Sequence, residues 1–130
     1  LEANEILLGL SIPQPSDRTG DAYLRFIPRT EMDIAVAGAG VSVTLDGDGN
    51  CTAARVGIGA VAITALNVPE AASALVGSKV DASALEAAAE ACSNAAKPIT
   101  DKRGTVEYRK KVVGVLCKRA GAIALERAIS

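Results

Sequence analysis

The stretch Val41-Ser42-Val43-Thr44-Leu45-Asp46-Gly47-Asp48-Gly49-Asn50-Cys51 decides the fold of this 130-residue chain. Its first five residues alternate apolar and polar side chains with a period of two, as in a half-buried strand. Residues 46–50 are aspartate, glycine and asparagine, which tolerate positive φ and favour a hairpin turn. The sequence therefore predicts a hairpin in which a long strand over residues 34–45 pairs with a returning strand over residues 51–60.

Two further strands are predicted before this hairpin. Residues 5–12 are mostly apolar and end at Pro13 and Pro15, which cannot donate to a sheet ladder. Residues 22–27 form the next predicted strand, and Pro28 and a charged connector over residues 29–33 separate it from the hairpin. Because the chain begins at Leu1, almost inside its first predicted strand, we expect a C-terminal piece of a longer polypeptide.

Three helices are predicted after the hairpin. Asn67 as a cap, with Pro69 and Glu70 behind it, predicts a short helix to about Val76 that ends at Gly77. A capping box at Ser83, or a cap at Asp81, starts a second helix that runs to about Ala96. The last helix covers about Val106 to Ile129 and carries a broad apolar stripe.

This order of elements predicts an α+β fold. Strands that are followed by helices favour an antiparallel sheet, here of three to four strands, with about three helices packed on one face. At this length the chain is expected to be a single domain over residues 1–130. Its core should be thin, because alanine and valine are abundant and only three aromatic residues are present.

The composition excludes several classes of function. The chain has no histidine, which removes histidine bases, triads and zinc sites, and we predict neither a catalytic residue nor a metal ligand. The three cysteines form no CxxC pair and are expected to be buried in a reduced, cytoplasmic protein. No apolar run is long enough for a membrane span.

The charge is distributed unevenly along the chain. Residues 1–96 carry a net charge of −7, and residues 97–130 carry one of +6. Few aromatic residues accompany these cations, which disfavours binding to nucleic acid.

Two glycine motifs were tested for phosphate binding. Neither Gly38-Ala39-Gly40 nor Gly57-Ile58-Gly59 continues into G-x-G-x-x-G between a strand and a helix, as a dinucleotide site requires. Both are interpreted as close strand packing or bulges.

Three stretches together resemble one family. They are Glu5-Ile6-Leu7 with Ile12-Pro13, then Tyr23-Leu24-Arg25 with Arg29 and Asp33-Ile34-Ala35, and finally residues 101–109, Asp-Lys-Arg-Gly-Thr-Val-Glu-Tyr-Arg. In order and spacing the chain resembles the C-terminal domain of the FAD-binding (medium) subunit of molybdenum hydroxylases, such as carbon monoxide dehydrogenase and xanthine dehydrogenase.

The resemblance implies a role in electron transfer. In this family electrons pass from a molybdenum cofactor subunit, through an iron–sulfur subunit, to FAD. The resemblance implies that FAD is held mostly by preceding domains absent from this chain, which alone would be catalytically silent. It places Arg25 near the flavin ring, where a cation favours the reduced anion, with Ile6 and Leu7 packed nearby.

The resemblance gives the remaining motif residues structural or assembly roles. Arg29 and Asp33 are expected to brace the connector through an ion pair. Arg103, Glu107, Tyr108 and Arg109, at the start of the last helix, are expected to serve structure or assembly. The alternative to the flavoprotein reading is a non-catalytic interaction module that docks an acidic partner through the basic residues 97–130.

Overall fold

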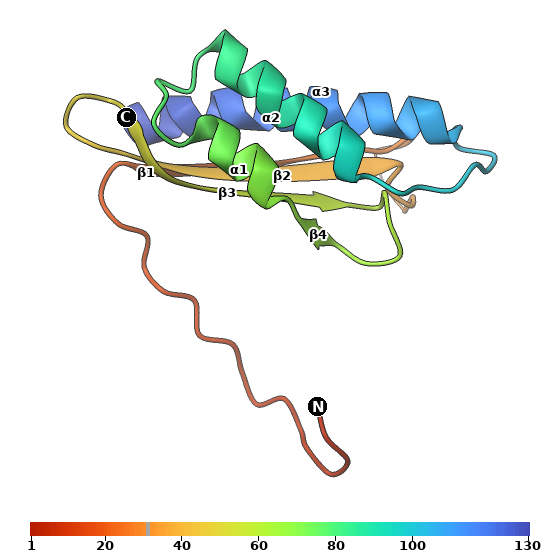
Figure 1. Ribbon diagram of the computed structural model, residues 1–130. Helices are drawn as coiled ribbons and strands as arrows, with labels where there is room; N and C mark the ends of the chain where they lie inside the picture. The colour runs from red at the N-terminus through yellow and green to blue at the C-terminus, as the bar shows by residue number, and fades with distance from the viewer. Residues whose placement is uncertain (31) are drawn as a thin grey trace.

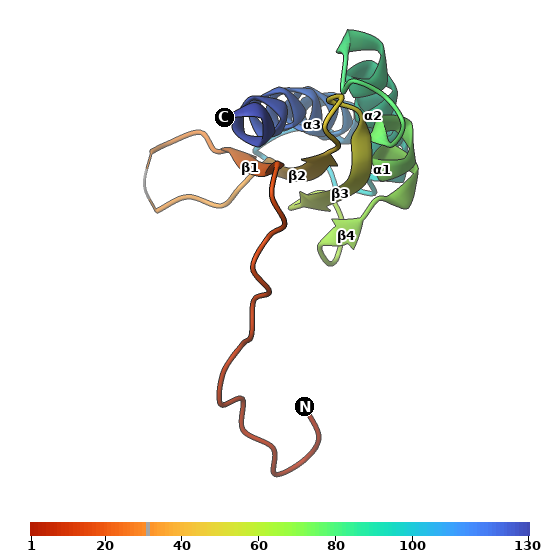
Figure 2. The same cartoon turned by 90° about the vertical axis from the view of Figure 1, so that its left-hand side faces the viewer.

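A four-stranded antiparallel sheet covered on one face by three helices forms the fold, as shown by a computed structural model that describes residues 1–30 and 32–130. The strands lie in the order β1 (Thr19–Phe26), β2 (Ala37–Leu45), β3 (Cys51–Gly59) and β4 (Leu66–Asn67). The helices are α1 (Pro69–Leu75), α2 (Ala82–Ala95) and α3 (Val106–Ile129), and all lie on the same side of the sheet (Figures 1 and 2). The predicted α+β class is confirmed.

The predicted hairpin is present with its turn at residues 46–50. The Asp46 carboxylate accepts hydrogen bonds from the backbone N–H groups of Asp48 (3.0 Å) and Asn50 (2.8 Å), and Gly49 has a φ of 80°. Val41 pairs with Val56 and Thr44 with Ala53, with a register shift between Thr44 and Leu45. The first strand begins at Ala37 and not at residue 34, because residues 34–36 belong to the β1–β2 loop.

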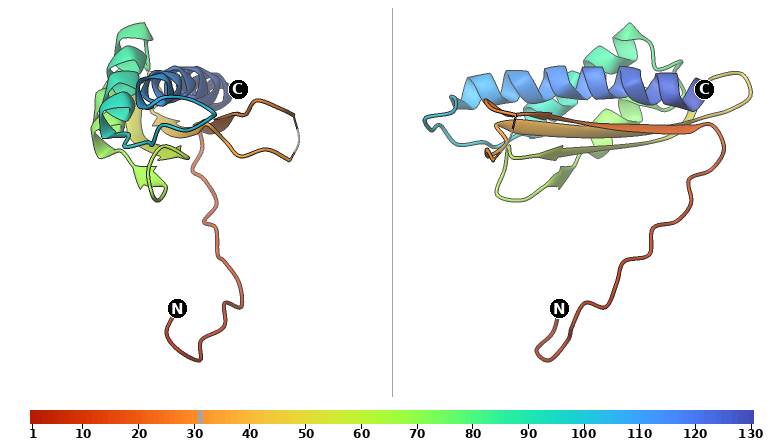
Figure 3. Two further views of the ribbon diagram at one scale, coloured as in Figure 1. Left: turned by 90° about the vertical axis from the view of Figure 1, so that its right-hand side faces the viewer. Right: turned by 180° about the vertical axis from the view of Figure 1, so that it is seen from behind.

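The strand predicted over residues 5–12 is wrong. This segment, the N-terminal arm (residues 1–18), lies away from the sheet on the side opposite the helices, as Figures 1 and 3 show. The side chains of Ile6, Leu8, Leu10 and Ile12 are 82–96% exposed. An apolar alternating pattern forms a strand only where another strand offers it backbone partners, and no strand of the described residues runs beside the arm.

The structure decides between the two caps predicted for α2 and corrects the start of α1. Asp81, the second of the two predicted caps, begins α2, and its carboxylate accepts a hydrogen bond from the N–H of Ala84 at 2.9 Å. Asn67 does not cap α1, because it lies in β4 opposite Gly57, and Val68 occupies the cap position without a side-chain bond. Gly77 follows α1 with a φ of 82°, so the predicted end of that helix is confirmed.

The core lies between the sheet and the three helices. Alternate strand residues face the helices and are fully buried, among them Val41, Val43, Val56 and Ile58. Helix α3 crosses above β1 and β2, and at Gly20 an added Cβ would overlap the backbone of α3 at Ala124. This close approach explains how a core of mainly alanine and valine can be well packed.

The three cysteines, Cys51, Cys92 and Cys117, are free and buried, as predicted. A hydrogen bond with Cys117, together with burial, raises the pKa of the Cys92 thiol. None of the helices in the described residues is both long and apolar enough to cross a membrane.

Candidate functional site

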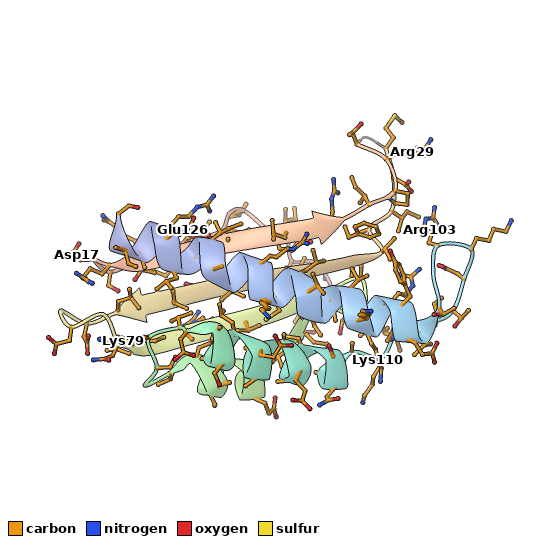
Figure 4. All side chains as sticks on the ribbon, turned by 90° about the horizontal axis from the view of Figure 1, so that it is seen from above. Asp17, Arg29, Lys79, Arg103, Lys110 and Glu126 are labelled. Carbon is orange, nitrogen blue, oxygen red and sulfur yellow. The ribbon has the colours of Figure 1, made fainter. Side chains whose placement is uncertain are left out.

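Two stretches far apart in the sequence meet at one end of the sheet. The β1–β2 loop (residues 27–36) and the start of α3 are joined by what we call the loop clamp, made of Arg29, Asp33, Asp101, Arg103 and Arg109. The Asp33 carboxylate lies 3.4 Å from Arg29 Nε and 3.5 Å from an Arg103 guanidinium nitrogen, and its side chain is only 8% exposed. Figure 4 shows Arg29 and Arg103 at this end. The predicted Arg29–Asp33 ion pair is therefore confirmed, and Arg103 adds to it.

Arg109 is the buried part of the loop clamp. It projects from the first turn of α3 and is 4% exposed. One guanidinium nitrogen donates to the Val36 carbonyl at 2.8 Å and another to the Asp101 carboxylate at 2.6 Å. Its Nε is buried without a partner among the residues that the structure describes. Because a buried guanidinium needs such partners, Arg109 fixes the start of β2 to the start of α3.

Both acidic residues of the loop clamp are stabilised as carboxylates. The backbone N–H of Ile34, followed by Arg29 and Arg103, holds the pKa of Asp33 below its ordinary value. The backbone N–H of Arg103 and the Arg109 guanidinium do the same for the pKa of Asp101. At neutral pH the loop clamp is therefore a set of charged pairs that acid can disrupt.

The aromatic residue of the last motif also faces the first strand. The rings of Tyr108 and Phe26 meet edge to face, with centroids 6.3 Å apart and an angle of 72° between their planes. Glu107 lies exposed in the first turn of α3, where a negative charge complements the helix dipole, and it does not join the loop clamp. Of the four predicted residues at the start of α3, three contact the first strand or the loop after it.

The uncovered side of the sheet, which we call the open face, carries Arg25. Side chains alternate along β1, so Asp21, Tyr23 and Arg25 are exposed on this face while Ala22 is buried beneath the helices. Opposite Arg25 in the ladder is Gly38, and opposite Gly38 is Gly59. Arg25 therefore stands beside strand positions that have no side chains.

The paired glycines support a residue that the sequence analysis did not select. Gly40 pairs with Gly57 as Gly38 pairs with Gly59, so the four positions form a block of bare backbone across β2 and β3. The Tyr23 ring rests on Gly38 and Gly40, because an added Cβ at Gly38 would overlap the Tyr23 hydroxyl and one at Gly40 would lie 3.5 Å from the ring. The interpretation of these motifs as close packing is correct for Gly38, but the contact is with a tyrosine.

The structure does not bring Ile6 and Leu7 to Arg25. Both lie in the N-terminal arm, where their side chains are 82% and 61% exposed. The arm extends from the open-face side of the sheet, away from the helices (Figure 3). Their predicted place beside a flavin ring stays a prediction.

The described residues offer binding and positioning groups. They contain no cluster of three or more acidic or cysteine side chains that could hold a metal ion. Arg25 supplies a fixed positive charge, and Tyr23 supplies an exposed aromatic ring beside it. Fold and site together define a small α+β domain in which one face of the sheet is covered by the helices and the other is left open.

The comparisons with known proteins identify that domain. The sequence profile of the CO dehydrogenase flavoprotein C-terminal domain matches residues 22–123. The chain therefore belongs to this family, as its motifs predicted. Both the loop clamp and the open-face residues Tyr23, Arg25 and the paired glycines fall inside the matched range.

Individual relatives agree with this assignment. The chain is 38% identical over 128 residues to the carbon monoxide dehydrogenase medium chain of Afipia carboxidovorans, covering 98% of this chain and 44% of the relative. The solved CO dehydrogenase from Oligotropha carboxidovorans superimposes with a TM-score of 0.83 at 38% identity, over 89% of this chain and 40% of that one. Quinoline 2-oxidoreductase from Pseudomonas putida 86 gives a TM-score of 0.83 at 28% identity, over 92% and 40%. This chain thus spans less than half the length of these relatives.

Proposed function

We propose that this chain is the C-terminal domain of the FAD-binding subunit of a molybdenum hydroxylase, and that it contributes one wall of the flavin site. The observation that carries the proposal is the family match over residues 22–123, which includes Arg25 and the loop clamp. The relatives with which the chain shares this range are medium chains of carbon monoxide dehydrogenase.

The open face fits a planar, electron-accepting group. Arg25 supplies a fixed cation at its rim, and an added Cβ at Gly59 would meet nothing within 4 Å, so a flat ring could approach the backbone there. FAD, when bound, supplies a ring that accepts electrons and gains negative charge. A guanidinium stabilises that charge and cannot lose its own. Ile6 and Leu7 are proposed to cover the ring from the arm.

The proposal assigns the rest of the reaction to other parts of the enzyme. Preceding domains of the subunit would hold most of FAD, and residues 1–130 would form the one domain described here. Iron–sulfur and molybdenum cofactor subunits would deliver the electrons, so the isolated chain is expected to be inactive. A cytoplasmic location belongs to this proposal and is supported by the three free cysteines.

The alternative of a basic docking module is not favoured. Three cations of the C-terminal quarter already pair within the chain, Arg103 with Asp33, Arg109 with Asp101 and Lys118 with Glu86. Its excess charge is thus partly used to hold the domain together.

Substitution of Arg25 in the intact FAD subunit tests the proposal. Arg25→Ala should lower the midpoint potential of the bound flavin and slow its reduction, because the reduced anion loses a stabilising charge. Arg25→Lys should preserve both. Arg55→Ala removes another exposed cation of the open face, on β3, and serves as the matched control. A wild-type flavin potential and reduction rate in Arg25→Ala would overturn the assigned role.

A further inference from the structure

Tyr23 occupies a position that the fold does not require. It is 62% exposed on the open face, yet its ring is held against the backbone of β2 by the absence of side chains at Gly38 and Gly40. Glycine within a strand is less stable than alanine because it loses more backbone freedom on folding, and the open face has four such positions in two opposed pairs. These four glycines lower the stability of the strands and add nothing to the core. Their presence therefore indicates that something binds to the open face.

A groove runs beside the tyrosine. It encloses about 270 Å³, with Tyr23 on one side, Leu66 on the other, and Gly40, Gly57 and Gly59 along its floor. At Gly57 and Gly59 no described residue fills the floor, since an added Cβ at Gly57 comes no closer than 3.7 Å to another described atom and one at Gly59 meets none within 4 Å. The groove is therefore shallow, floored by glycine backbone and bordered by an aromatic ring.

The positive charge of Arg25 beside this groove favours an occupant that carries negative charge. Arg25 lies two residues from Tyr23 on the same face of β1, and both pair with glycines of β2. A flat ring with a developing negative charge would find an aromatic wall, a bare floor and a cation together. A peptide strand would also fit a bare floor, but it would not need the cation.

We propose that Tyr23 and the four paired glycines form a seat for one edge of the flavin ring, and that Tyr23 binds the ring directly. This inference rests on the proposed function and adds to it a residue and a surface. Gly38 and Gly40 hold Tyr23 in place, while Gly57 and Gly59 keep the floor open. The seat fixes the position of the ring, and the Arg25 guanidinium stabilises the negative charge that the ring gains.

The experiment uses the full-length FAD subunit and two variants that act on opposite sides of the groove. Gly59→Val fills the floor at a position where the added Cβ meets nothing. Tyr23→Leu removes the aromatic wall, and Tyr23→Phe keeps it. Ala53→Val adds the same side chain to the open face of β3 six residues earlier, beyond the groove, and is the matched control. The readouts are the affinity of the apo-subunit for added FAD and the fluorescence of the bound flavin.

The expected results are specific to each variant. Gly59→Val should weaken FAD binding at least tenfold, and Tyr23→Leu should raise bound-flavin fluorescence severalfold, because a contacting tyrosine quenches it. Tyr23→Phe should keep the wild-type affinity for FAD but should also raise the fluorescence, because phenylalanine does not quench a flavin as the tyrosine phenol does. Ala53→Val should resemble the wild type in both readouts. Gly59→Ala, a smaller change, should give an intermediate affinity and covers the case in which the valine variant does not fold.

Two results would count against the seat, and they differ from a failure of the proposed function. Wild-type affinity and fluorescence in both Gly59→Ala and Tyr23→Leu would overturn it. Loss of subunit stability in Gly59→Ala with unchanged flavin properties would also overturn it and would show that a peptide segment fills the groove. If the wild-type subunit binds no FAD at all, the proposed function itself is wrong.

Discussion

The two faces of the sheet use glycine in opposite ways. On the helix-covered face, Gly20 lets the backbone of α3 approach so closely that an added Cβ would overlap Ala124. On the open face, an added Cβ at Gly59 would meet none of the described residues within 4 Å. The first glycine serves the core, while the second serves no contact among the residues that the structure describes. A missing side chain can therefore serve packing or function, and only its surroundings tell which.

The largest effect is expected on the covered face. Gly20→Ala should lower the free energy of unfolding of this chain by about 3 kcal/mol, because backbone atoms of α3 cannot move aside as a flexible side chain would. Urea unfolding followed by circular dichroism measures the loss. A stability equal to that of the wild type would show that α3 does not contact β1 at backbone distance.

Removal of the buried guanidinium should have the next largest effect. Arg109→Met should cost about 2 kcal/mol, because the Val36 carbonyl loses its partner and Asp101, which is partly exposed, loses only some of its compensation. Lys111→Met, on the exposed side of the same helix, is the control and should stay within about 0.5 kcal/mol of the wild type. Equal urea midpoints for the two variants would contradict a structural role for Arg109.

Acid should release the end of the sheet before the core. The folded-state pKa values of Asp33 and Asp101 lie below the ordinary 3.8, so their stabilisation is complete above that pH and is lost as the pH falls through the lower folded values. The stability difference between the wild type and Asp33→Asn should therefore be present at pH 7 and shrink below about pH 4. Urea titrations across this range measure it, and a difference that grows in acid would contradict the ion pairing.

The smallest effect is expected on the open face. Gly59→Ala should change the unfolding free energy of this chain by no more than about 0.5 kcal/mol, because the added methyl meets no atom and the residue has no positive φ. The same urea assay on Gly20→Ala and Gly59→Ala tests whether the two faces of the sheet differ in how tightly their glycines are packed. Equal losses of unfolding free energy in the two variants would show that they do not.

Much of the fold could be predicted from local patterns. The hairpin turn, the end of α1 at Gly77 and the extent of α3 depend on residues close together in sequence, and all were predicted. The strand predicted over residues 5–12 is absent from the structure, because pairing depends on a neighbouring strand and an apolar pattern cannot supply one. The cap at Asn67 failed for a related reason, since its pairing with Gly57 in the sheet outweighs its local preference.

In the candidate site too, contacts between residues close in sequence could be predicted and long-range contacts could not. The Arg29–Asp33 pair spans four residues and was predicted, whereas the contact of Asp33 with Arg103 spans 70 residues and could not be found by spacing. Tyr23 was named only as part of a family motif, because its contact with Gly38 and Gly40 depends on the pairing register of β1 and β2. The two Gly-x-Gly motifs were visible in the sequence. That their glycines lie opposite one another on the open face could be seen only from the strand pairing.

The hydrogen bond from Arg127 to the Asp21 carbonyl, 2.6 Å long, joins residues 106 positions apart. The last helix thus covers the first strand, so the inner side of β1 stays uncovered until α3 has been synthesised. Contacts of such long sequence separation slow folding, and an exposed edge in the meantime invites aggregation. The end of α3 is therefore expected to be among the last parts of this domain to pack against the sheet.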